Sequence, residues 1–214
     1  MRTLLELILP QYCGGCGSAG TGWCAECAAI LTQPPMRIRP RTAPGAPCWA
    51  LGPYTGPARR AVVAAKESGR RDLAAPLGLA LARGIGRLRA PERPLILVPA
   101  PSRRVAARRR GGDPVVRTAR VAAGWLTDCH LAPVLWARGE VRDSVGLGVA
   151  ARRDNLAGRI AVRITASSPL LTVADADIVL VDDVLTTGAT AAESVRVLAA
   201  AGLRVRAVMV TCAA

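Results

Sequence analysis

Hydrophobic positions along the chain change their spacing several times, and these changes predict its elements. Apolar residues at helical spacing predict helices near residues 58–67, 73–88, 115–126 and 190–201. Short apolar runs predict buried strands at residues 49–51, 95–98, 160–162 and 178–181, and residues 205–210 are expected to form a final strand. Strands that alternate with helices are typical of an α/β fold, so we expect a parallel sheet with flanking helices from residue 48 onward.

The first 47 residues have a different character. A cysteine cluster occupies residues 1–33, and residues 34–47 are rich in Pro and Arg without any period, which indicates a linker or a wrapped arm. We therefore expect a four-cysteine module, this linker, and one domain over residues 48–214. The opening apolar stretch is too short to span a bilayer and contains Glu6, so we expect no membrane insertion and a cytoplasmic protein.

Composition adds a strong positive charge to this picture. The chain has 29 basic residues, of which Lys66 is the only lysine, and a formal net charge of +14. Such a balance favours phosphate-bearing or nucleic-acid partners. A general preference of this Ala-, Arg- and Gly-rich chain for arginine explains the charge equally well, so charge alone does not assign a function.

The strongest chemical signal follows the predicted strand at residues 178–181. Asp182 and Asp183 come directly after it, and the short-side-chain turn Thr186, Thr187, Gly188, Ala189 and Thr190 then leads into a helix. Ligands of open α/β folds bind at the carboxyl edge of the sheet, and a turn at a helix start directs N–H groups at an anion. Carboxylates beside an anion site suit a ligand with hydroxyls in its middle and a phosphate at one end, such as ribose 5-phosphate.

A purely structural interpretation is a capping box, since Thr190 and Glu193 have the required spacing. A capping box accounts for Thr190 but not for two adjacent aspartates at the end of a buried strand.

These residues resemble the signature of the type I phosphoribosyltransferases. The resemblance implies that Asp182 and Asp183 bind the ribose hydroxyls of 5-phosphoribosyl-1-pyrophosphate (PRPP), and that residues 186–190 hold its 5-phosphate, with Mg²⁺ bound alongside PRPP. In that superfamily a loop after an earlier strand holds the pyrophosphate. The corresponding residues here are Ala100, Pro101, Ser102 and Arg103, with Ser102 and Arg103 as the expected contacts.

One position departs from that signature. Oxopurine-specific members often carry a carboxylate where this chain has Thr186, and a threonine of ordinary pKa is a poor general base. The resemblance therefore implies PRPP binding without identifying an acceptor, and no catalytic residue is assigned.

A second chemical signal lies near the N-terminus. Two CxxC pairs with seven residues between them predict one tetrahedral metal site, made by Cys13, Cys16, Cys24 and Cys27. Four sulfur ligands leave no open position, so we expect a structural metal. Zinc is favoured, and iron in a rubredoxin-like site or a redox-active pair of dithiols are the alternatives.

The order of these features resembles the ComF family of competence-associated, phosphoribosyltransferase-like proteins. The matching features are the four-cysteine finger, Lys66 and its neighbours, the loop at residues 98–101, the pair at residues 110–111, residues 152–156 and the two aspartates. Residues 112–113 and 144–146 depart from the family pattern. The resemblance implies a part in bringing single-stranded DNA into the cell, together with partner proteins of DNA uptake.

An alternative hypothesis of a different class is a DNA-binding adaptor that uses the PRPP site only as a sensor or phosphate-binding site. A dense cationic run suits a phosphate backbone and comprises Arg103, Arg104, Arg108, Arg109 and Arg110. A solvated helix face explains the same run. Turnover of PRPP with an acceptor separates the enzyme from the adaptor, which only binds.

Overall fold

The strands form one six-stranded sheet and one two-stranded sheet. The computed structural model describes residues 11–102, 112–138 and 158–214. Its strands are β1 (Met36–Ile38), β2 (Cys48–Pro53), β3 (Leu95–Pro99), β4 (Cys129–Leu131), β5 (Leu135–Ala137), β6 (Ile160–Val162), β7 (Asp177–Leu185) and β8 (Val205–Ala213). The large sheet has the order β1-β2-β8-β7-β3-β4, and only the β1–β2 pair in it is antiparallel. The small sheet is the antiparallel pair of β5 and β6.

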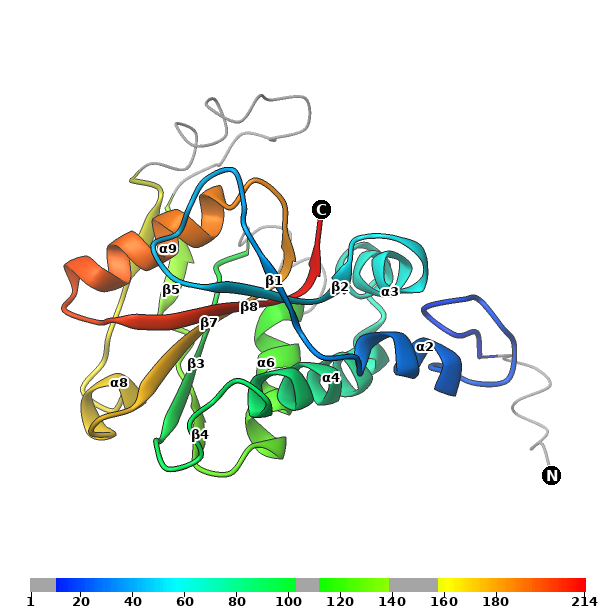
Figure 1. The fold of residues 1–214 in the computed structure, drawn as a ribbon, viewed down its shortest axis with the longest axis horizontal. Coiled ribbons are helices and arrows are strands. Elements are labelled where there is room, and N and C mark those ends of the chain that lie inside the picture. Colours follow the sequence, from blue (N-terminus) through cyan, green and yellow to red (C-terminus); the bar gives the residue numbers. More distant parts are fainter. Residues whose placement is uncertain (1–10, 103–111, 139–157) are drawn as a thin grey trace.

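Helices cover both faces of the large sheet. The described helices are α2 (Ala25–Leu31), α3 (Gly56–Glu67), the short 3-10 helix η1 (Arg71–Leu73), α4 (Ala74–Gly86), α6 (Pro114–Trp125), α8 (Pro169–Thr172) and α9 (Ala189–Ala200). The elements α3, α4 and α6 pack on one face, and α9 lies on the other side of β7 and β8 (Figure 1). The prediction of a mixed α/β fold with a mostly parallel sheet and flanking helices is confirmed.

The central strands are apolar at successive positions because each face meets a hydrophobic core. On β3, Leu95 and Leu97 join the core under α4 and α6, whereas Ile96 and Val98 join the core under α9. All four are at most 1% exposed. A strand covered on both faces reads as an unbroken apolar run, which is why the sequence predicted it.

Three short strands were not predicted from the sequence. β1, β4 and β5 each span three residues, too few to show an alternation. β1 lies within residues 34–47, where we expected a linker or an arm, and it pairs with β2 at the edge of the sheet. Their strand character comes from neighbouring strands rather than from their own pattern.

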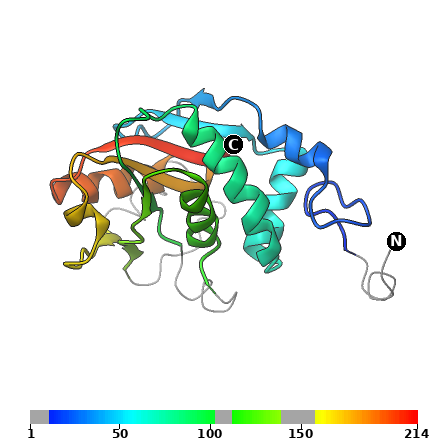
Figure 2. The same ribbon diagram turned by 90° about the horizontal axis from the view of Figure 1, so that it is seen from below.

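The cysteine-rich segment lies at one end of the molecule, beyond α3 (Figure 2). It is not isolated from the domain, because Leu31 of α2 is 1% exposed and belongs to the core that α3 and α4 share. The arm that follows runs from α2 along the sheet edge to β2 (Figure 1). Among the described residues, no helix combines the length and the apolar character needed to cross a membrane.

Candidate functional site

The acidic pair lies inside a longer strand than the sequence predicted. β7 continues to Leu185 because β8 still pairs with it there, with Asp182 opposite Val210 and Leu185 opposite Ala213. The neighbouring strand β3 has already ended at Pro99, opposite Val181. Asp182 and Asp183 therefore project past the end of β3, at the carboxyl edge of the sheet where α/β folds bind ligands.

Lys66, in the last turn of α3, forms an ion pair with this acidic pair. Its Nζ lies 3.0 Å from Oδ2 and 3.2 Å from Oδ1 of Asp183. Burial lowers the pKa of Lys66, but the charges of Asp183 and Asp182 outweigh burial and raise it above the ordinary value. Lys66 is therefore a cation at neutral pH.

The two aspartates do not have the same environment. Burial and the adjacent charge of Asp183 raise the pKa of Asp182 well above its usual range. One carboxylate oxygen of Asp182 accepts the backbone N–H of Asp183 at 2.8 Å. Asp183, in contrast, has the Lys66 ammonium on both of its oxygens. Asp182 therefore resists ionisation, whereas the negative charge of Asp183 is balanced by the Lys66 ammonium.

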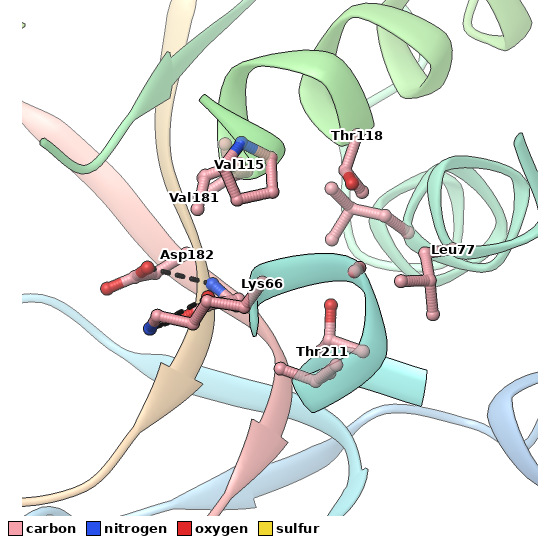
Figure 3. A pocket seen from close by; sticks show the side chains of 12 residues that line it. Lys66, Leu77, Val115, Thr118, Val181, Asp182 and Thr211 are labelled. Carbon is pink, nitrogen blue, oxygen red and sulfur yellow. Dashed lines mark hydrogen bonds and ion pairs between the residues drawn. The ribbon is translucent and has the colours of Figure 1, made fainter. Parts of the chain in front are cut away.

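A small cavity adjoins the pair on the side of α4 and α6. Lys66 and Asp182 lie at one end of it, while Leu77 and Thr118 lie at the other (Figure 3). Its volume is about 20 Å³, which is room for a single water molecule. Apolar side chains line most of its wall. Because the described cavity is too small for a base or a sugar, a ligand of the aspartates would have to approach from the open edge of the sheet.

The turn after β7 leads directly into the N-terminus of helix α9. Gly188 is the N-cap of α9 and has φ 86°, a left-handed conformation that glycine adopts without steric cost. Thr187 and Ala189 are buried, and Thr186 is exposed. The twelve-residue helix α9 begins directly behind the turn, so its positive end faces this segment, and the N–H of Ala189 donates to the Thr187 hydroxyl at 3.4 Å.

The structure excludes the capping-box interpretation. The helix is capped at Gly188 and not at Thr190. The Glu193 side chain instead accepts the backbone N–H of Gly158 at 2.8 Å and pairs with Arg196 at 2.7 and 2.8 Å. The hydroxyl of Thr190 is therefore not committed to a capping box.

A segment distant in sequence closes one side of the turn. The backbone N–H of Thr42 donates to the carbonyl oxygen of Thr187 at 2.8 Å. A Cβ atom at Gly188 would overlap the carbonyl oxygen of Thr42 and would lie 2.7 Å from Cβ of Pro40. The residues after β1 thus form an arm on the domain, and they hold the turn from the side of Gly188.

The loop after β3 contains the residues expected to contact pyrophosphate. Ala100 is buried and donates its N–H to the carbonyl oxygen of Val181 at 2.8 Å, which holds the loop beside β7. Pro101 and Ser102 are partly exposed, and the Ser102 hydroxyl donates to Asp113 at 2.5 Å. Arg103 lies outside the described residues, as does the remainder of the cationic run at residues 103–110.

Asp113 is a residue of this region that the sequence analysis did not assign. It is the N-cap of α6, and one of its oxygens accepts the N–H of Val115 at 2.9 Å while the other accepts from Ser102. The sequence signal was an Asp directly before Pro114, the usual order of an N-cap and the first helical residue. Asp113 therefore fixes the start of α6 to the loop after β3.

The four cysteines converge as predicted. The four Sγ atoms lie within 4.8 Å of one another; they belong to Cys13, Cys16, Cys24 and Cys27. The Cys16 and Cys24 sulfurs are 3.6 Å apart. Zinc–sulfur bonds of about 2.3 Å in a tetrahedron separate sulfur ligands by about 3.8 Å. The cluster is thus close enough to hold one metal ion, and its donor set is consistent with structural zinc.

Backbone N–H groups favour the thiolate form of Cys13, whereas burial raises the pKa of Cys27. The N–H groups of Gly15 and Cys24 each donate to the Cys13 sulfur at 3.4 Å. Burial raises the pKa of Cys13, but such backbone hydrogen bonds outweigh it and bring the pKa to about 6. The N–H of Ser18 lies 3.5 Å from the Cys16 sulfur in the same manner.

Arginines attach the cysteine module to the helices of the domain. Arg60 of α3 donates to the carbonyl oxygen of Gly15, and Arg70 donates to the carbonyl oxygens of Tyr12 at 3.1 Å and Gly22 at 3.4 Å. Asp72 orients Arg70 through bonds of 2.7 and 2.8 Å. Guanidinium groups suit this task because one side chain reaches several carbonyl groups.

The remaining cysteines and the histidine lie apart from these sites. Cys48 is buried in the core under α9, and Cys212 is buried in the core under α4 and α6. Cys129 packs against the core under α4 and α6. His130 is on β4, its side chain is 42% exposed, and it lies 3.5 Å from Asp128. They fit ordinary packed or surface positions.

The fold and the two sites define a mixed α/β protein with a four-cysteine cluster and an acidic pair at the edge of a mostly parallel sheet. No protein-family model matches the chain, and no curated protein sequence matches it. Its chemistry therefore has to be inferred from its own residues.

Proposed function

We propose that this chain binds PRPP at the carboxyl edge of its sheet and belongs to the phosphoribosyltransferase class, in the manner of the ComF family that its sequence resembles. The observation that carries the proposal is the adjacency of the acidic pair on β7 to the turn capped by Gly188. These two features lie five residues apart and supply a diol site and a phosphate site. Ribose 5-phosphate has its hydroxyls and its phosphate in this order.

Each part of PRPP has a matching group in the proposal. Asp182 and Asp183 accept hydrogen bonds from the ribose hydroxyls, and residues 186–190 receive the 5-phosphate. The loop at residues 100–103 receives the pyrophosphate, with the Ser102 hydroxyl beside the N-cap of α6. Mg²⁺ bound to PRPP would neutralise pyrophosphate charge and so improve it as a leaving group.

Transfer of the phosphoribosyl group would require few groups from the protein. The bond between C1 and the pyrophosphate oxygen breaks, and its electron pair leaves with pyrophosphate. A lone pair of the acceptor then forms the new bond to C1, and the acceptor releases its proton to solvent. Arg103 would stabilise the departing charge. The four-cysteine cluster has no part in this step and serves to hold the N-terminal module.

The direct test is calorimetric titration with PRPP in the presence of Mg²⁺. We expect one binding site per chain, with ribose 5-phosphate binding more weakly because it lacks the pyrophosphate. A screen of nucleobases for pyrophosphate release then decides between turnover and binding alone. Absence of PRPP binding by the folded, zinc-loaded protein would refute the proposed function.

A second candidate function, binding of single-stranded DNA, is favoured by a specific surface feature. Arg138 and Arg163 each lie 5.7 Å from the ring of Trp136, on the small sheet of β5 and β6. The Trp136 ring is partly buried, and arginine beside an aromatic ring suits contact with phosphates and bases. Together with the net charge of +14, this arrangement supports an adaptor role, in which PRPP binds without turnover.

A further inference from the structure

The position of the single lysine is notable in a chain that otherwise uses arginine. Lys66 is the one lysine among 29 basic residues, and it pairs with Asp183. A preference for arginine would place a guanidinium here if any cation served. The chemical difference between the two side chains therefore matters at this position.

An ammonium and a guanidinium would meet Asp183 differently. Lys66 approaches Asp183 as a compact charge, 3.0 and 3.2 Å from its two oxygens. A planar fork would occupy both outer lone pairs of the carboxylate, whereas a point charge leaves room for an incoming hydroxyl.

The Lys66–Asp183 ion pair also balances negative charge that would otherwise attract a metal ion. Two adjacent carboxylates at a sheet edge form an oxygen-rich site of the kind that Mg²⁺ and Mn²⁺ prefer. Here the Lys66 ammonium already lies on Asp183, and its side chain is 41% exposed, so it stands between the pair and the solvent.

We propose that Lys66 is the built-in counter-ion of the acidic pair: it positions Asp183 to accept a ribose diol without a divalent cation, and it keeps Mg²⁺ from binding the two aspartates directly. The inference rests on the proposed PRPP site. Metal then reaches the site only with the pyrophosphate, and Lys66 is a positioning residue.

The first experiment titrates ribose 5-phosphate into the zinc-loaded protein with and without added Mg²⁺. Wild type should bind equally under both conditions. Lys66→Met should bind about tenfold more weakly without Mg²⁺ and recover with Mg²⁺, because the metal replaces the missing cation. Arg59→Met is the matched control, since it removes an exposed charge from the same helix and should change neither value.

A second experiment follows Mn²⁺ by electron paramagnetic resonance, without any sugar phosphate. We expect no ion at the acidic pair of wild type, one in Lys66→Met, and none in the double variant Lys66→Met with Asp183→Asn. Mn²⁺ bound by wild type as tightly as by Lys66→Met would overturn the inference. Undiminished ribose 5-phosphate binding by Lys66→Met without Mg²⁺ would overturn it as well.

The variant Lys66→Arg tests whether the site needs an ammonium rather than a guanidinium, because this substitution keeps the positive charge. It should bind ribose 5-phosphate as weakly as Lys66→Met and should not recover with Mg²⁺. Wild-type affinity in Lys66→Arg would contradict the argument from shape. If wild type itself binds neither ribose 5-phosphate nor PRPP, the proposed function fails, whereas the Mn²⁺ measurement still decides whether Lys66 excludes metal.

Discussion

The backbone N–H of Thr42 donates to the carbonyl oxygen of Thr187, 2.8 Å away, and so joins the arm after β1 to the proposed phosphate turn. The partners are separated by almost the whole α/β domain in sequence. The contact leaves no room for a side chain at Gly188, where a Cβ would overlap the Thr42 carbonyl oxygen. The arm is therefore part of the structural support of the turn.

Gly188→Ala should destabilise the protein more than backbone strain explains. The matched control is Gly202→Ala, because Gly202 has φ 79° but nothing within 4 Å of its Cβ position. The control should cost about 1 kcal/mol from the left-handed conformation alone. Gly188→Ala should cost about 2 kcal/mol more, since the arm must move. Urea unfolding measures both, and equal losses would show that the arm does not restrain the turn.

Asp183→Asn should abolish most of the stabilisation that PRPP and Mg²⁺ give to the folded state. A ligand that binds only the folded protein raises the melting temperature by mass action. Loss of the partly exposed ion pair with Lys66 should itself cost only about 1 kcal/mol, so the variant stays folded. Thermal unfolding with and without PRPP is the measurement. Unchanged PRPP affinity in the folded variant would rule out the assigned site.

The raised pKa of Asp182 predicts a pH dependence of stability. Its folded-state pKa lies above the unfolded value of about 4, so between the two values the folded state binds more protons than the unfolded state. The free energy of unfolding should therefore fall as the pH rises through this window, and this contribution should level off above the folded pKa. Asp182→Asn should lack that component. Urea unfolding at a series of pH values for both proteins would detect it, and identical profiles would contradict it.

One metal ion per chain should be held by the four cysteines. Elemental analysis of protein purified without chelator should find zinc, and Cys24→Ser should lower its content while Cys129→Ser, outside the cluster, leaves it unchanged. Removing the metal should unfold the N-terminal module and spare much of residues 48–214, because so small a module buries little apolar surface. Hydrogen exchange distinguishes the two regions. A wild-type protein without stoichiometric metal would refute the site.

The DNA-binding candidate predicts a strong salt dependence. Binding of single-stranded DNA should weaken steeply with salt, as counterions are released from the phosphates. Changing Arg108, Arg109 and Arg110 together to Ser should reduce the salt slope by about two units, at about 0.7 per lost contact. PRPP binding should persist in the triple variant. Absence of DNA binding at low salt would reject the candidate, and a slope indifferent to the change would assign the DNA to another surface.

The elements with a clear local period could be predicted from the amino-acid sequence alone. β3 and the start of β7 are unbroken apolar runs because helices cover both of their faces, and the main helices show the spacing of a single buried stripe. The four-cysteine cluster was equally evident, since two CxxC pairs bring four sulfur atoms together by local turns. In each case the information lies within a few neighbouring residues.

Which distant residues meet depends on the packing of the complete fold. Lys66 and Asp183 are 117 positions apart, and neither their identities nor their spacing indicates an ion pair. The three-residue strand β1 and the contact of Thr42 with Thr187 likewise depend on the sheet edge and the turn beside them. Such contacts arise from the packing of complete elements, which sets distances between side chains that no local pattern encodes.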